Sequence, residues 1–279
     1  MFRKIFGNRK LVLILDILFL IVTVFCYVYI YEVEKVKTAF VSDAITFVED
    51  NKNPVFRISK IVLYSSAYAV DNSEQGMLEN IDISQFTDIA VYIDNKIKVK
   101  ELTEENTINQ MYIDNISLKT NNLSGNLNFN YKPSEMFGKF VDLPNYEEQG
   151  IVFNIPHSNE EQLEMGFERS VFFTDCSNPI SLGFVNKNLL TNCQLGNKNV
   201  NGEILFDGSI LKNANINLND ISGDIRFSIN IKNNLDEDFI CNVDIKHNFQ
   251  DTENSIYSGY IMKVLNTEGA KYDFLKVSR

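Results

Sequence analysis

One acidic residue, Asp16, lies inside the most apolar stretch of the chain and is the strongest candidate for chemistry. Residues 11–31 read LVLILDILFLIVTVFCYVYIY, and Asp16 is the only charged residue among them. A carboxylate at the centre of a membrane-spanning helix costs roughly 2.5–3.5 kcal/mol on insertion scales, so such residues are usually functional. Asp16 therefore indicates a contact with a partner inside the membrane, a proton relay, or a hydrated or protonated side chain near the inner interface.

Residues 15–25, LDILFLIVTVF, resemble the single spanning helix of ion-driven motor B-subunits, such as those of flagellar stators. In that family an Asp shortly after the cytoplasmic boundary carries the proton, so the resemblance implies this role for Asp16. The peptidoglycan-binding domain of those subunits is not recognisable downstream. The motor function is therefore an alternative interpretation.

A second candidate site is the segment 71–82, DNSEQGMLENID, whose spacing resembles that of an EF-hand calcium loop. Calcium takes six to eight oxygen ligands, and a bidentate Glu usually closes the loop. The ligands in this segment would be Asp71, Ser73, Gln75 and Asp82. Because Gln75 is neutral and Asp82 is shorter than Glu, the competing interpretation is a solvated turn after a helix. Calcium is the one cofactor that the sequence suggests.

The cysteines indicate a disulfide more than a metal site. Cys26 lies in the apolar run, whereas Cys176, Cys193 and Cys241 follow it. Cys176 and Cys193 could pair in an oxidising compartment. Cys241 falls on the apolar face of a predicted strand, which is typical of a buried free thiol. No Cys-x-x-Cys or paired-His spacing for zinc occurs.

Signatures of catalysis are scarce in this chain. It has two His, no Gly-x-Ser-x-Gly, no His-Glu-x-x-His and no phosphate-binding glycine loop. Residues 189–193, LLTNC, resemble the Thr-Leu-x-Thr-Cys motif of sortase-type transpeptidases, but His157 and Arg226 lie at the wrong intervals for that family. Catalysis by a carboxylate pair stays an alternative, because sequence does not place the 37 acidic residues in space. We expect a non-catalytic protein.

The apolar run has the length of a membrane span. A helix of 21 residues covers about 30 Å, the thickness of the hydrocarbon core of a bilayer. Arg3, Lys4, Arg9 and Lys10 precede it, so the positive-inside rule predicts a cytoplasmic N-terminus and an extracytoplasmic C-terminal part. A cleaved signal peptide would have small residues at the cut, whereas the run ends in bulky ones.

The charge balance argues against nucleic acid as a partner. The chain carries a formal charge of −11, while binding to phosphates needs clustered Lys and Arg. The abundance of Asn, Ile and Lys suggests an AT-rich bacterial genome. We therefore expect partners among other envelope or membrane proteins.

Residues 32–50 continue the helix beyond the predicted span. Apolar residues recur there at helical spacing and form one stripe: Val33, Val36, Phe40, Ala44 and Phe47. The stripe either docks on the protein's own domain or contacts a partner or a second copy. Residues 55–70 are ambiguous, with a second short helix slightly favoured over a strand.

From about residue 86 the apolar pattern has a period of two, which predicts half-buried antiparallel strands. Clear strands cover 125–132, 223–232 and 239–247, and hairpins are expected at 88–99, turning near Asp94-Asn95, and at 259–277, turning around 266–269. About ten such strands suffice for a two-sheet sandwich.

The predicted protein is thus mostly β, with an N-terminal anchor. Residues 1–10 form a cytoplasmic tail, 11–31 a transmembrane helix, 32–85 a helical stalk and loop, and 86–279 an extracytoplasmic antiparallel β-sandwich. The expected function is a non-catalytic cell-envelope scaffold or a subunit of a membrane complex. A ligand- or calcium-binding sensory module and the motor subunit are the alternatives.

Overall fold

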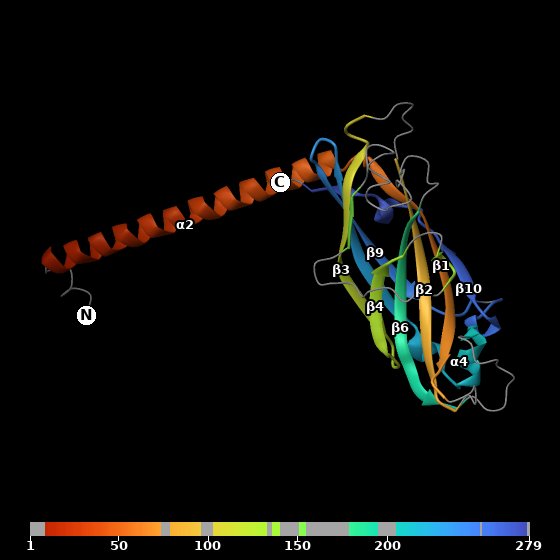
Figure 1. Cartoon of the computed structure of the whole chain (residues 1–279). Helices are drawn as coiled ribbons and strands as arrows, with labels where there is room; N and C mark the ends of the chain where they lie inside the picture. The colour runs from red at the N-terminus through yellow and green to blue at the C-terminus, as the bar shows by residue number, and fades with distance from the viewer. Residues whose placement is uncertain are drawn as a thin grey trace. The chain divides into compact units, whose positions relative to one another are not determined.

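The computed structural model describes residues 9–73, 79–95, 103–132, 136–139, 151–154, 179–194, 205–251 and 253–277. The chain divides between Lys52 and Asn53 into a helical unit and a β unit (Figure 1). Each unit is described by itself below.

The helical unit is one continuous helix, α2 (Arg9–Asp50), of 42 residues. At 1.5 Å per residue it is about 63 Å long, roughly twice the thickness of a hydrocarbon core. No Gly or Pro interrupts it, and the predicted helix at 11–31 and its continuation over 32–50 are both confirmed. The helix ends where the backbone and side-chain amides of Asn51 both donate to the carbonyl of Phe47, and Pro54 follows.

The β unit contains two antiparallel sheets. Sheet A has the order β10-β1-β2-β6-β4, with β7 also paired to β1, and sheet B has the order β11-β9-β8-β3-β5. The strands are β1 (Phe56–Asp71), β2 (Ile81–Asn95), β3 (Ile108–Thr120), β4 (Asn126–Tyr131), β5 (Ile151–Asn154), β6 (Ile180–Cys193), β7 (Leu205–Phe206), β8 (Gly223–Asn233), β9 (Asp238–His247), β10 (Ile261–Leu265) and β11 (Leu275–Lys276).

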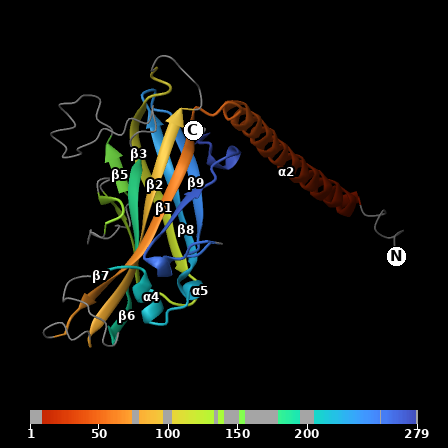
Figure 2. The ribbon, with the colours of Figure 1, turned by 90° about the vertical axis from the view of Figure 1, so that its right-hand side faces the viewer.

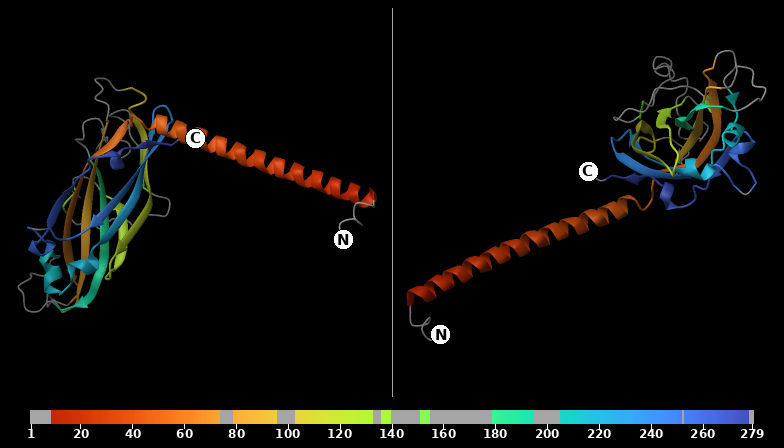
Figure 3. Two further views of the ribbon diagram at one scale, coloured as in Figure 1. Left: turned by 180° about the vertical axis from the view of Figure 1, so that it is seen from behind. Right: turned by 90° about the horizontal axis from the view of Figure 1, so that it is seen from below.

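Short helices and turns connect the later strands. They are α4 (Ser209–Asn213), α5 (Leu218–Ile221), and the 3₁₀ turns η3 (Ile256–Ser258) and η4 (Ala270–Tyr272). Figure 2 shows α4 and α5 together at one end of the β unit, near β7 and β6. Figure 3 shows the same strands from behind and from below.

Both sheets contribute to one large hydrophobic cluster. Alternate residues of β1 and β2 in sheet A, such as Ile61 and Ile89, belong to the same buried cluster as Met111, Ile229 and Val243 of sheet B. The predicted alternation of apolar and polar residues therefore places the apolar side chains in this cluster, because every second side chain of a strand points to one face.

A second hydrophobic cluster lies at the end that carries α4 and α5. Ala67 and Ile83, from the other halves of β1 and β2, pack there with Leu211, Leu218 and Phe249. The short helices thus bury their apolar residues against this end of sheet A.

The structure corrects the prediction for residues 55–70, which form the strand β1 and not a second helix. β1 pairs with β2 from Phe56 to Asp71 and with β10 on its other side. Apolar side chains at 61 and 63 follow a period of two. The local propensities for helix and strand are similar here, and the strand forms because it pairs with a neighbour on each side. The β unit therefore begins near residue 56, and the helix ends at residue 50.

Of the two predicted hairpins, the one at 259–277 is wrong, whereas the strands at 125–132, 223–232 and 239–247 are confirmed. In the predicted hairpin at 88–99, residues 88–95 are the second half of strand β2, which pairs with β1 and β6, so the predicted turn at Asp94-Asn95 is wrong. The predicted second arm, residues 96–99, lies outside the described residues. In the segment 259–277, β10 pairs with β1 in sheet A, but β11 pairs with β9 in sheet B. That segment crosses between sheets, so the turn at 266–269 does not close a hairpin.

Candidate functional site

The least expected feature of the β unit is a buried ion pair on sheet A. Lys132, directly after β4, lies with its Nζ atom 2.5 Å from Oδ1 of Asp88 on β2. The two side chains are only 4% and 1% exposed. Ionised side chains are almost never buried unless they are paired, so this position requires both partners.

The ion pair fastens the segment 136–139 to the sheet. The amide of Gly138 donates to Oδ2 of Asp88 at 2.6 Å, and Nζ of Lys132 donates to the carbonyl of Lys139. The ring of Phe137 lies 6.1 Å from that of Tyr64 on β1. Every described polar contact of the pair therefore serves to hold chain segments together.

Burial dominates the electrostatics of this pair. It raises the pKa of Asp88 to about 6, although the charge and hydrogen bond of Lys132 and the amide of Gly138 oppose the rise. Burial likewise lowers the pKa of Lys132, against the attraction of Asp88. Perturbed pKa values often mark functional sites, but structural ion pairs show them too.

Aromatic rings surround the ion pair. Nζ of Lys132 lies 5.3 Å from the centre of the Phe86 ring, within the range of a cation–π contact. Tyr64 packs 6.3 Å from Phe86 and stacks on Tyr260 at 5.3 Å. Burial, and then the neighbouring Tyr260 and Asp88, raise the pKa of Tyr64. The tyrosine therefore stays protonated at neutral pH.

An exposed apolar strip begins at this aromatic group and follows β10. Tyr260, Met262 and Val264 are 56%, 54% and 62% exposed. Among the described residues β10 pairs only with β1, so it is an edge strand of sheet A. Edge strands with exposed apolar side chains invite pairing with another chain. We call these three residues the β10 strip.

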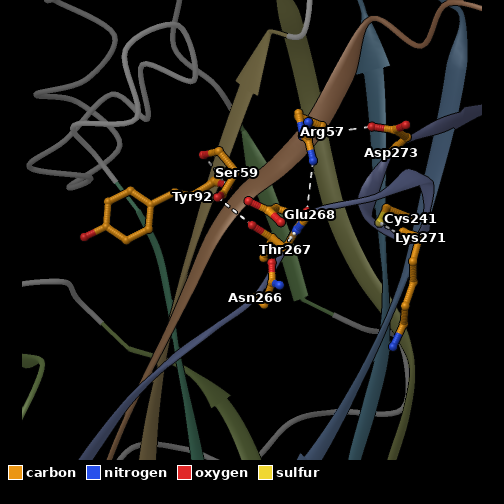
Figure 4. Close-up of polar contacts among 9 residues, drawn as sticks. All are labelled: Arg57, Ser59, Tyr92, Cys241, Asn266, Thr267, Glu268, Lys271 and Asp273. Atoms are coloured by element: carbon orange, nitrogen blue, oxygen red, sulfur yellow. Dashed lines mark hydrogen bonds and ion pairs between the residues drawn. The ribbon is translucent and has the colours of Figure 1, made fainter.

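Residues 266–274, the C-terminal strap, connect β10 to β11 and pass beside Arg57 at the start of β1 (Figure 4). Arg57 donates to the carbonyl of Thr267 at 2.9 Å, and the Thr267 hydroxyl donates to the carbonyl of Ser59 at 2.6 Å. The amide of Phe274 donates to the carbonyl of Phe56 at 2.9 Å. The strap is therefore hydrogen-bonded to the start of β1 where the chain passes from sheet A to sheet B.

Cys241 lies beneath this strap. Its Sγ atom is 3.9 Å from the carbonyl of Lys271 (Figure 4). Burial, together with Asp273, raises the pKa of this thiol to about 12. The side chain is 2% exposed and belongs to the large hydrophobic cluster, as predicted for a buried thiol.

The predicted membrane residues all lie on α2. Asp16 is exposed on the helix, and Val36, Phe40 and Phe47 of the stripe are 66%, 72% and 39% exposed. Ala44 is exposed as well, and Val33 is half-buried. The helix has the length and composition of a membrane anchor or of a signal sequence. A contact of Asp16 or of the stripe with a partner stays a prediction.

The predicted calcium loop connects β1 to β2. The Asp71 carboxylate accepts from the amide and hydroxyl of Ser73. The Asp82 carboxylate accepts from the side chain of Asn72 at 2.8 Å and from the amide of Asn192 at 3.2 Å. Gln75 lies outside the described residues. Strands flank this loop on both sides, whereas helices flank an EF-hand loop.

Of the two cysteines in the predicted disulfide, Cys193 is a described residue. Cys193 ends β6, half-buried, and its possible partner Cys176 lies outside the described residues. Within the described ranges, no group of three or more His, Cys, Asp and Glu side chains could hold a metal ion. The pairing of Cys176 with Cys193 stays a prediction.

Sequence analysis did not single out Asp88 or Lys132. Both lie in segments predicted as strands, at positions that read as solvent-facing. The available signal was the position of Asp88 at the head of the apolar run IAVYI. Comparison of the sequence with protein-family models, with curated proteins and with solved structures finds no match.

Proposed function

We propose that this chain is a single-pass, membrane-anchored interaction protein. In this proposal α2 spans the membrane, residues 32–50 form a stalk, and the β unit is a two-sheet sandwich on the extracytoplasmic side. The hydrophobic cluster shared by both sheets supports the sandwich. The basic residues at 3, 4, 9 and 10, before the apolar run, support a cytoplasmic N-terminus.

The observation that carries the proposal is the β10 strip on an edge strand. Monomeric soluble domains rarely keep contiguous apolar surface exposed unless it binds something. The strip continues into half-buried Val62 and Tyr64, which lie opposite Val264 and Met262 in the β1–β10 register. The partner would be another envelope or membrane protein, and the role would be that of a scaffold or a complex subunit.

The surface is tested by site-specific photocrosslinking in the native membrane. A photoreactive amino acid replaces Met262 in the strip, and the control replaces Lys246, an exposed residue of β9 in sheet B. We expect a discrete adduct from position 262, identified by mass spectrometry, and none from position 246. Equal or absent adducts at the two positions would contradict a role for the strip.

The membrane topology is tested by labelling single cysteines with a membrane-impermeant maleimide. The native cysteines are replaced by alanine, and Lys4→Cys and Glu268→Cys are compared in intact cells. We expect position 268 to react at once and position 4 to react only after lysis. Labelling of position 4 in intact cells would reverse the orientation, and mature protein that begins after Tyr31 would exclude an anchor.

Asp16 offers a separate test of the membrane partner. Asp16→Asn is expected to leave the β unit folded but to reduce recovery of a partner that contacts this carboxylate. Unchanged recovery removes Asp16 from the proposal, and it also removes the motor alternative if ion-dependent activity of the complex is retained.

A further inference from the structure

Five polar side chains form a layer between the two hydrophobic clusters of the β unit. We call them the polar layer: Ser65, Gln85, Thr87, Asn186 and His247. They come from β1, β2, β6 and β9, and none is more than 5% exposed.

The strands show how the layer separates the clusters. Along β1, Leu63 belongs to the large cluster and Ala67 to the second, and Ser65 lies between them. On β9 and just beyond it, Ile245 belongs to the large cluster and Phe249 to the second, and His247 lies between them. The polar layer therefore interrupts what would otherwise be one continuous apolar core.

Thr87 is the centre of the layer. Its Oγ1 accepts from Nε2 of Gln85 at 2.8 Å and lies 2.6 Å from Nε2 of His247. The Ser65 hydroxyl is 2.9 Å from the same oxygen. At one side, Oδ1 of Asn186 accepts from the amide of Gly125 at 2.6 Å. These bonds use part of the hydrogen-bonding capacity of the layer.

Three atoms of the layer have no hydrogen-bond partner among the described residues. They are Oε1 of Gln85, Nδ2 of Asn186 and Nδ1 of His247, and all three are buried. Gln85 and Asn186 lie directly opposite each other in the β2–β6 register. A buried polar atom without a partner costs about 1–3 kcal/mol, so native proteins pair such atoms with protein groups or with water.

The chemistry of the layer restricts what could bind there. The layer contains no Asp, Glu, Lys or Arg, and burial, aided by the charge of Lys263, lowers the pKa of His247 to about 3. The imidazole is therefore neutral at physiological pH. A buried layer without charged side chains that presents both an acceptor and a donor suits a small neutral molecule that both donates and accepts.

We infer that ordered water binds within the polar layer, donating to Oε1 of Gln85 and accepting from Nδ2 of Asn186. Buried waters of this kind typically make about three hydrogen bonds to groups that the protein leaves unpaired. The water is then part of the core and bridges the neighbouring strands β2 and β6 of sheet A.

Magnetisation transfer from water tests the inference on the full chain in detergent micelles. We expect the side-chain amide protons of Asn186 to show a cross-relaxation peak with water whose sign indicates a residence time longer than a nanosecond. Asn233 is the matched control, because it is also 0% exposed but its Nδ2 already donates to Glu105 and Glu237. No such peak is expected at Asn233.

Two variants separate bound water from other sources of the peak. Thr87→Val removes the hydroxyl that could relay magnetisation, and the peak at Asn186 must persist in it. Gln85→Met removes the acceptor at similar volume and should weaken the peak. The inference is overturned if Asn186 and Asn233 behave alike, if the peak disappears in Thr87→Val, or if the Gln85 and Asn186 amides contact each other directly.

Discussion

Removing one partner of the buried ion pair is expected to destabilise the β unit strongly. In Asp88→Asn the amide oxygen can still accept from Gly138, but the ammonium of Lys132 loses its counter-ion and keeps the carbonyl of Lys139 and the ring of Phe86. An uncompensated buried charge costs about 3–5 kcal/mol, and the remaining carbonyl contact favours the lower value. For a unit of this size, about 3 kcal/mol lowers the Tm by about 6–12 °C.

The assay is thermal unfolding of the full chain in detergent, followed by circular dichroism because the chain has no Trp. The matched control is Glu237→Gln, which removes the charge from a pair with Lys276 of similar separation, 2.7 Å, whose side chains are 28% and 31% exposed. Ion pairs that remain accessible to solvent contribute about 0–1 kcal/mol, so this half-buried control should shift the Tm by no more than about 4 °C.

A double-mutant cycle isolates the coupling within the pair. Lys132→Met alone leaves the Asp88 carboxylate buried and is also expected to be destabilising, whereas Asp88→Asn with Lys132→Met leaves no charge. The double variant should lose less stability than the sum of the two single variants. If Asp88→Asn lowers the Tm no more than Glu237→Gln does, the pair is hydrated and the reasoning from burial is refuted.

Three further outcomes are expected. The pKa of His247 in the folded state, about 3, lies below its unfolded value near 6.5, so stability present above pH 6.5 is lost as the pH falls toward 3. In His247→Gln the Tm should therefore fall less steeply with decreasing pH over this range. An unchanged pH dependence of the Tm would assign the loss to other groups. Gly223→Ala places a Cβ 1.8 Å from the backbone oxygen of Lys119 and should lower the Tm by several degrees. Gly269→Val is the comparison, because Gly269 has a positive φ and open space around it, so this variant tests backbone strain without a clash. Equal losses of Tm would mean that the contact at residue 223 does not matter. Because the Asp71 and Asp82 carboxylates already accept hydrogen bonds in the β1–β2 connection, millimolar calcium should leave the Tm unchanged. A rise in Tm would support the predicted calcium site at residues 71–82.

The sequence predicted those elements whose pattern is local. Residues 223–232 and 239–247 alternate cleanly because β8 and β9 have one face in the core, and the register between them follows from that alternation. The long helix followed from an uninterrupted apolar run without Gly or Pro. These features need no knowledge of distant residues.

The errors come from contacts that sequence does not place. Residues 55–70 form a strand because β10, some 200 residues later, supplies a partner on one side. Lys132 looks like the polar end of a strand, and only its contacts with Asp88 on β2 and with the segment 136–139 show that it is buried and paired. The polar layer was hidden for the same reason, since Thr87 and His247 meet across 160 residues of chain.

The C-terminal strap has a consequence for biosynthesis. Arg57 and Thr267, which bond at the start of β1, are separated by 210 residues. The contact between β1, which is synthesised first, and the strap, which is synthesised last, can therefore form only at the end of synthesis. Closing so long a loop is also slow. During synthesis the part of β1 that pairs with β10, residues 61–65, therefore has an open edge until β10 emerges, and an open edge can pair with other chains.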